Sequence, residues 1–160
     1  VFPSLPQKPK TAAAASRPVS QLEFREIAEM ETFEVAGLKV RALPLEHGGD
    51  CTCLGFDFGQ ADRVVYLSDL SRIPDHTMAV IMERPISLLV LDTLHVDRDV
   101  PSHIGMPTAV AIARRVGATR TVLVGLSHTL GDHDAVNELL RAELSSGLDI
   151  QLAHDGLLVP

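Results

Sequence analysis

The sequence lacks any run of lysine or arginine. Its 14 basic residues are outnumbered by 21 acidic ones, which gives a formal net charge of −7 at pH 7. Duplex nucleic acid is bound through basic patches, so this balance argues against nucleic acid as a partner and leaves room for a small nucleotide. Nothing reaches the roughly 18 apolar residues of a membrane span, and no signal peptide opens the chain. We therefore expect a cytoplasmic protein with no membrane partner.

Cysteine is scarce. Cys51 and Cys53 are separated by Thr52 in what we interpret as a strand, where alternation points both side chains to one face. A Cys-x-Cys pair can bind metal, but the chain has no second pair, and the pattern favours two small buried thiols in a reducing compartment. The two cysteines, Tyr66 and Ser68 also form no pattern typical of a nucleophilic triad.

What is present fits one folded domain. The chain has 160 residues and 46% hydrophobic content, enough for a real core. Residues 1–20 hold four prolines and an alanine run, which is typical of a linker or surface loop. Because the chain starts abruptly without Met, we interpret 1–20 as continuing from a missing N-terminal half and 21–160 as the domain.

The apolar pattern changes along the chain. Strands are predicted at 21–27, 33–35, 38–45, 51–58 and 63–67, followed by helices at 74–83, 107–116 and 132–144 that alternate with strands at 88–91 and 121–124. Residues 150–153 and 157–159 are predicted to form a closing hairpin. This order indicates an α/β layered fold with helices against a mixed sheet.

Several of the seven histidines stand where a predicted strand ends. Such positions line the crevice where α/β sheets bind ligands. His47 ends one strand and Asp69 another, and both are residue types that hold divalent metals. On the residues alone, His47 fits a ligand or a hydrogen-bonded loop histidine equally well, and Asp69 fits a capping or turn aspartate.

Other candidates follow later strands. His103 precedes a helix N-terminus, which suits a phosphate contact or a proton donor, with a solvent-facing loop histidine as the alternative. Either His128 or His133 fits a metal ligand. The alternative is that both lie at the first turn of the third helix and have no functional role. Asp92 and His95 are predicted to pair and orient a ligand.

Six strings in a fixed order carry a family resemblance. They are Leu43–Gly48, Val65–Asp69 with Ile73-Pro74, Leu89–Asp92, Ser102-His103, Leu126–His128 and His154–Gly156. In this order they resemble the C-terminal half of the metallo-β-lactamase superfamily, nearest to the cyclic-phosphodiesterase branch of phosphonate breakdown and to tRNase Z-like nucleases. The resemblance covers about residues 20–160 and implies part of an αββα sandwich.

The resemblance implies a metal-dependent phosphodiesterase. His47 would complete the ligand set of one metal, Asp69 would bridge two metals, and His103 would be the catalytic proton donor or hold the phosphoryl oxygens. Two divalent ions, zinc or manganese, would lie roughly 3.5–4 Å apart and activate a hydroxide that attacks a small or cyclic phosphodiester.

The sequence departs from that family in two places. The upstream H-x-H-x-D-H motif, which supplies most ligands, is absent from these residues, and Val124-Gly125 stands where the branch has a Thr-His pair. His128, or less readily His133, would then take the last ligand position. The remaining candidates for supporting roles around the metals are Asp92, His154 and Asp155.

The missing motif also leaves alternatives. The fold's first half would supply a second sheet, so one sheet face here is expected to need that half or a second copy of the chain as partner. A degenerate fold acting as a non-catalytic interaction module is the main alternative to the enzyme. A mononuclear site of another hydrolase class, built from His47, Asp69 and His95, is a third.

Overall fold

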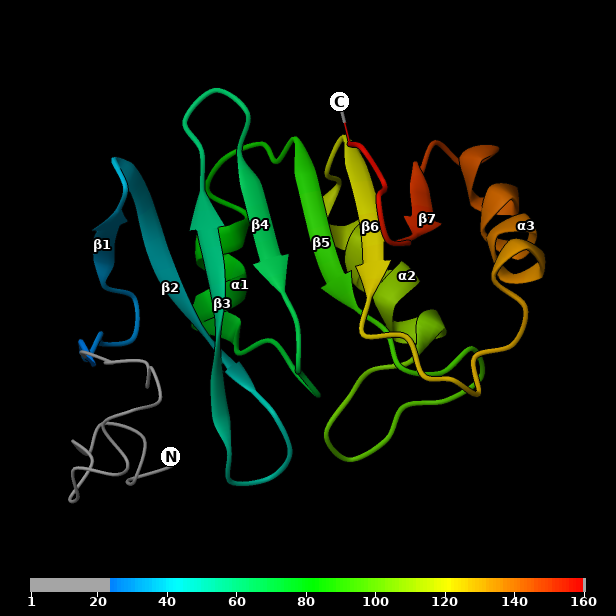
Figure 1. Ribbon diagram of the computed structural model, residues 1–160, viewed down its shortest axis with the longest axis horizontal. Coiled ribbons are helices and arrows are strands. Elements are labelled where there is room, and N and C mark those ends of the chain that lie inside the picture. Colours follow the sequence, from blue (N-terminus) through cyan, green and yellow to red (C-terminus); the bar gives the residue numbers. More distant parts are fainter. Residues whose placement is uncertain (1–23, 160) are drawn as a thin grey trace, which may run out of the picture.

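The computed structural model describes residues 24–159, so the predicted linker over 1–20 lies outside the described part. One seven-stranded sheet carries the fold, with its strands in chain order (Figure 1). The strands are β1 Thr32–Val35, β2 Leu38–Glu46, β3 Thr52–Phe58, β4 Val64–Leu67, β5 Leu88–Asp92, β6 Arg120–Val124 and β7 Ile150–Leu152. The helices are α1 Asp75–Ile81, α2 Met106–Val116 and α3 His133–Leu144.

Strand direction decides which chain segments meet. β1 to β4 form an antiparallel meander, whereas β4 to β7 are parallel and are joined through α1, α2 and α3. Since β2 and β4 are both antiparallel to β3, β2 runs in the same direction as β4, β5 and β6. The carboxyl ends of these four strands therefore lie along one edge of the sheet, at the bottom of Figure 1. This arrangement confirms the predicted α/β class.

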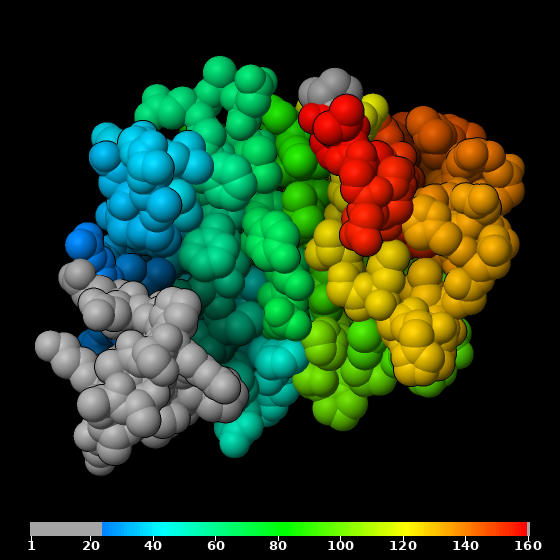
Figure 2. Space-filling model, viewed as in Figure 1, coloured from blue at the N-terminus to red at the C-terminus, as the bar shows by residue number. Residues whose placement is uncertain are grey.

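The two faces of the sheet differ. One face carries the core, in which leucines of β2, β4, β5 and β6 pack against residues of all three helices. The other face has no helix over it in Figure 1, and Figure 2 looks onto it. A cross-strand row runs over this face through Phe56, Tyr66, Val90 and Val122. Tyr66 is 38% exposed, although a tyrosine in a sheet centre would normally be covered.

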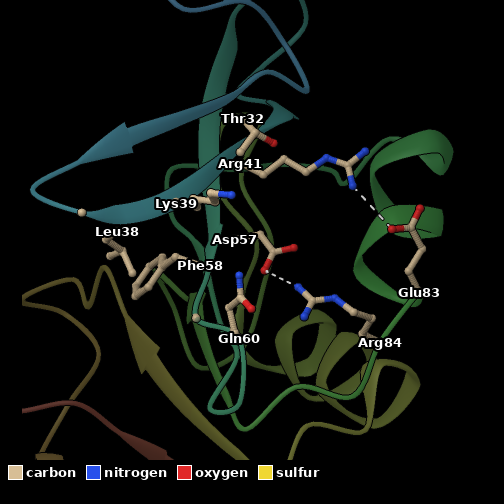
Figure 3. A pocket seen from close by; sticks show the side chains of 11 residues that line it. Thr32, Leu38, Lys39, Arg41, Asp57, Phe58, Gln60, Glu83 and Arg84 are labelled. Atoms are coloured by element: carbon tan, nitrogen blue, oxygen red, sulfur yellow. Dashed lines mark hydrogen bonds and ion pairs between the residues drawn. The ribbon is translucent and has the colours of Figure 1, made fainter.

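A buried ion pair closes the sheet end opposite that edge. Arg63 is 2% exposed and holds Asp57 through two hydrogen bonds of 2.9 and 2.8 Å. Its remaining N–H groups donate to the carbonyls of Val80 and Ile81 at the end of α1 and of Arg84 just after it. Arg84 also approaches the Asp57 carboxylate from a neighbouring pocket, at 3.8 Å (Figure 3). The guanidinium thus joins β3 to the end of α1.

The structure corrects three sequence predictions. Residues 24–27 form no strand, and 21–23 lie outside the described residues. The closing hairpin is wrong, because β7 follows a crossover helix and pairs parallel to β6, and 157–159 form no strand. Cys51 is exposed and Cys53 is half-buried, so the expected pair of buried thiols is also wrong. Among the described residues, no helix has the length and apolar character needed to cross a membrane.

Candidate metal centre

Three side chains meet at the edge formed by the carboxyl ends of β2, β4, β5 and β6. His47 follows β2, Asp69 follows β4, and His103 lies in the long connection between β5 and α2. One nitrogen or oxygen from each lies within 4.8 Å of the other two. Imidazole nitrogen and carboxylate oxygen are donor types that hold divalent metals, so a group this close together is a candidate metal centre.

His47 is held with one ring nitrogen free. Its Nδ1 lies 2.8 Å from the carbonyl oxygen of Ser102. A carbonyl only accepts hydrogen bonds, so Nδ1 carries a proton, and in the neutral ring Nε2 is the nitrogen with the free lone pair. The rings of His47 and His103 meet edge to face, with centroids 4.8 Å apart. Histidines that bind a metal through one ring nitrogen are commonly oriented by a hydrogen bond at the other ring nitrogen, as Ser102 does for His47.

Asp69 has an unusual backbone. Its φ is +58°, in the left-handed region that costs a non-glycine residue about 1 kcal/mol or more. Its carbonyl accepts a hydrogen bond from the Cys53 thiol, with Sγ 2.8 Å from the oxygen. Burial raises the pKa of the Cys53 thiol, and the charges of Asp69 and Cys51 raise it further. The thiol therefore keeps its proton at neutral pH and can donate it.

His103 is backed by a buried carboxylate. Its Nδ1 lies 2.9 Å from Oδ2 of Asp92, which has no exposed surface. Burial raises the pKa of Asp92, while the hydrogen bond and charge of His103 oppose that rise. The predicted pairing of Asp92 with His95 is wrong: His95 follows three residues later and its Nδ1 instead lies 3.4 Å from Thr129 Oγ1.

Gly125 makes room for this carboxylate. A Cβ placed on Gly125, whose φ is +75°, would lie 2.3 Å from Oδ1 of Asp92. That oxygen is buried and has no hydrogen-bond partner within the described part of the chain. The glycine that stands at the predicted position of a family ligand therefore leaves space for Asp92 instead.

Backbone hydrogen bonds lock the contributing loops together. The amide of Ile104 donates to the carbonyl of Leu70 at 3.0 Å, which ties the His103 loop to the Asp69 loop. Asp99 accepts from the amide of Gly105 at 2.6 Å and from the hydroxyl of Thr108 at 2.8 Å, at the start of α2. These contacts tie the loops that carry Asp69 and His103 to each other and to the start of α2.

The other predicted site residues lie outside the group formed by His47, Asp69 and His103. His128 is exposed in the loop after β6. His133 begins α3, where its Nε2 lies 3.0 Å from the carbonyl oxygen of Ala153, and its ring meets that of His154 at 6.0 Å. Asp155 belongs to the turn after β7, closed by a hydrogen bond from the amide of Leu157 to the carbonyl of His154.

Two residues that contact the site residues are not predicted from the sequence. Ser102 orients His47 through its backbone carbonyl, which no side-chain pattern can reveal. Cys53 contacts Asp69, and continuing the β3–β4 register places the two opposite each other. Only a correct strand pairing could have found that contact from sequence.

Comparison with known proteins agrees with this geometry. Residues 3–126 match the family described as the β-lactamase superfamily domain. The solved structure of a diphosphatase from the PhnP family is 34% identical, with a TM-score of 0.71, over 84% of this chain and 47% of that protein. Human tRNase Z, short form, is 19% identical with a TM-score of 0.58, over 80% of this chain and 45% of that protein, and shows the fold.

One curated relative is an octanoyltransferase of Porphyromonas gingivalis (strain ATCC BAA-308 / W83). It is 27% identical over 128 residues, which is 80% of this chain and 25% of that protein. The chain thus spans a quarter of this relative and about half of the similar solved structures. The resemblance to the metallo-β-lactamase superfamily, on the side of the PhnP family and tRNase Z, is confirmed.

Proposed function

Because the chain belongs to the β-lactamase superfamily domain family, we propose that the intact protein is a metal-dependent hydrolase of small or cyclic phosphodiesters. The observation that carries the proposal is the convergence of His47, Asp69 and His103 within 4.8 Å. Both imidazoles use Nδ1 for a hydrogen bond, so their Nε2 atoms are the ones left for chemistry. This chain would supply part of the site.

The donor set fits divalent zinc or manganese. Imidazole nitrogen and carboxylate oxygen are ligands for both ions, and the fixed tautomer of His47 presents a lone pair. His47 would bind one ion, Asp69 would bridge two, and His128 would complete the set. When bound, two such ions lower the pKa of a water molecule and neutralise charge on the phosphate.

We assign His103 the handling of a proton. The Asp92 carboxylate fixes its ring and stabilises the imidazolium, so Nε2 can hold a proton toward the leaving oxygen of the substrate. The buried position of Asp92 strengthens this electrostatic support, because little water screens it. His133, His154 and Asp155 are assigned supporting roles only.

One similar protein's name supports a phosphate-containing substrate, the broader class to which phosphodiesters belong: the 34% identical neighbour is a diphosphatase. A histidine beside a helix N-terminus also suits an anionic substrate: His103 lies three residues before α2 begins.

The test is hydrolysis of bis(p-nitrophenyl) phosphate by the intact protein with added Mn²⁺ or Zn²⁺. We expect metal-dependent release of nitrophenol that Asp69→Asn abolishes. Absence of hydrolysis of this and of cyclic phosphodiesters would contradict the proposal. Metal counting in His128→Ala and His133→Ala separates the two candidates for the last ligand, because only the true ligand lowers the metal content.

The helix-free sheet face favours a second role, binding of a partner layer. Phe56, Tyr66 and Val90 place apolar surface across its centre. We propose that it is covered by a second sheet from the rest of the polypeptide or by a second copy of the chain. Light scattering of this chain alone separates these two partners: a dimer indicates the second copy, and a monomer indicates the rest of the polypeptide.

If the intact protein binds no metal, a non-catalytic module that binds a partner through this sheet face becomes the better account.

A further inference from the structure

Cys53 touches the backbone of the residue proposed to bridge the metals. It lies on β3, and its Sγ is 2.8 Å from the carbonyl oxygen of Asp69 and 3.7 Å from that of Ser68. The β3–β4 pairs are Phe56 with Tyr66 and Phe58 with Val64. Continuing this register places Cys53 opposite Asp69, although β4 has already ended at Leu67. The thiol therefore contacts the chain just where it leaves the sheet.

The contact falls on a peptide that needs support. Asp69 has φ +58°, a conformation that few non-glycine residues adopt unless their surroundings impose it. Leaving the sheet also removes Asp69 from the ladder of amide hydrogen bonds, and its carbonyl takes the thiol as donor instead. The direction of the Asp69 carboxylate depends on this backbone conformation.

We propose that Cys53 is a positioning residue: its thiol hydrogen bond holds the left-handed Asp69 peptide so that the carboxylate faces His47 and His103. The inference rests on the proposed function, because it assigns Asp69 to a metal. The Cys53 thiol itself is not a ligand in this arrangement, since its hydrogen is donated to the Asp69 carbonyl. Cys51 has no such role, because it is exposed and precedes β3.

The experiment measures Mn²⁺ affinity of the intact protein by isothermal titration. Mn²⁺ is the probe because it prefers oxygen and nitrogen over thiolate ligands. Cys53→Ala and Cys53→Val remove the donor, with Val keeping more of the volume, and Cys53→Ser restores a donor. Cys51→Ala is the matched control, because it removes a thiol two residues away. Loss of one ordinary hydrogen bond predicts affinity weaker by about fivefold in both donor-free variants.

The expected pattern is weaker Mn²⁺ binding in Cys53→Ala and Cys53→Val, and near-normal binding in Cys53→Ser and Cys51→Ala. In an Asp69→Asn background, Cys53→Ala should change the affinity no further. A purely structural cysteine would lower the melting temperature of the metal-free protein and leave Mn²⁺ affinity unchanged, which would overturn the inference. If Asp69→Asn alone binds Mn²⁺ normally, the proposed metal site fails, and the inference with it.

Discussion

The Nδ1 atom of His103 lies 2.9 Å from Oδ2 of Asp92, and this carboxylate has no exposed surface. Eleven residues separate the two in sequence, and the whole loop between β5 and α2 must fold for them to meet. The second oxygen of Asp92 lies against Gly125 without a hydrogen-bond partner among the described residues. Through this contact Asp92 can orient the imidazole of His103.

Replacing Asp92 with Asn should lower turnover without removing metal. Asn keeps the shape of the side chain but loses the charge that stabilises a protonated His103, so we expect kcat for bis(p-nitrophenyl) phosphate to fall by about a hundredfold. The metal content should match that of the unchanged protein, because Asp92 lies behind His103. Equal turnover in the two proteins would remove Asp92 and His103 from proton transfer.

The same substitution should alter the pH dependence of stability. Burial raises the pKa of Asp92 above its ordinary value in the folded state, so its contribution to stability is full below the unfolded pKa and is lost as pH rises through the folded pKa. Asn does not titrate. The free energy of unfolding of both proteins can be measured in urea from acidic to neutral pH. As pH rises, the unchanged protein should lose stability relative to Asp92→Asn. A constant difference would argue against the raised pKa.

Gly125→Ala should disturb the pair formed by His103 and Asp92. The added Cβ would meet Oδ1 of Asp92 at 2.3 Å, which forces the carboxylate to move and costs about 1–3 kcal/mol beyond the backbone strain. Gly147→Ala is the matched control: its φ of +84° is similar, but a Cβ there meets nothing within 4 Å. The melting temperature and the turnover number should both fall further in Gly125→Ala than in Gly147→Ala. Equal losses in the two variants would mean that the backbone strain of alanine at a positive φ acts alone.

The buried Arg63 should be essential for folding stability. Arg63→Ala leaves Asp57 charged and 6% exposed without its main partner, so we expect a loss of about 3–5 kcal/mol in the free energy of unfolding. Arg141→Ala removes a side chain that is 69% exposed and paired with Glu138 on one helix, and should cost no more than about 0.5 kcal/mol. Similar losses for both arginines would contradict the assignment.

The sequence is enough to predict those site residues that lie just after the end of a strand. His47 and Asp69 lie one and two residues after the ends of β2 and β4, so the topology alone brings them to one edge. His103 lies in a long loop, where the following helix and the family resemblance indicate a functional role but no strand end fixes its position. Its partner was mistaken for His95, because nearness in sequence to Asp92 says nothing about how a loop folds back.

The remaining failures have similar physical causes. The terminal apolar run at 157–159 has strand character, but β7 is an edge strand that completes a parallel crossover, and no antiparallel partner is needed there. Arg63 occurs within a predicted strand, and nothing local shows that it reaches the carbonyls at the end of α1. Contacts made by backbone carbonyls leave no trace in the pattern of side chains.

The most direct test of the account is the metal content of the intact protein, measured by elemental mass spectrometry beside Asp69→Asn. The account predicts about two zinc or manganese ions per chain. It also predicts a clear loss of metal in the variant, because Asp69 is assigned to both ions. No bound metal in the intact protein, or the same content in Asp69→Asn, would contradict the assignment of His47 and Asp69 as metal ligands.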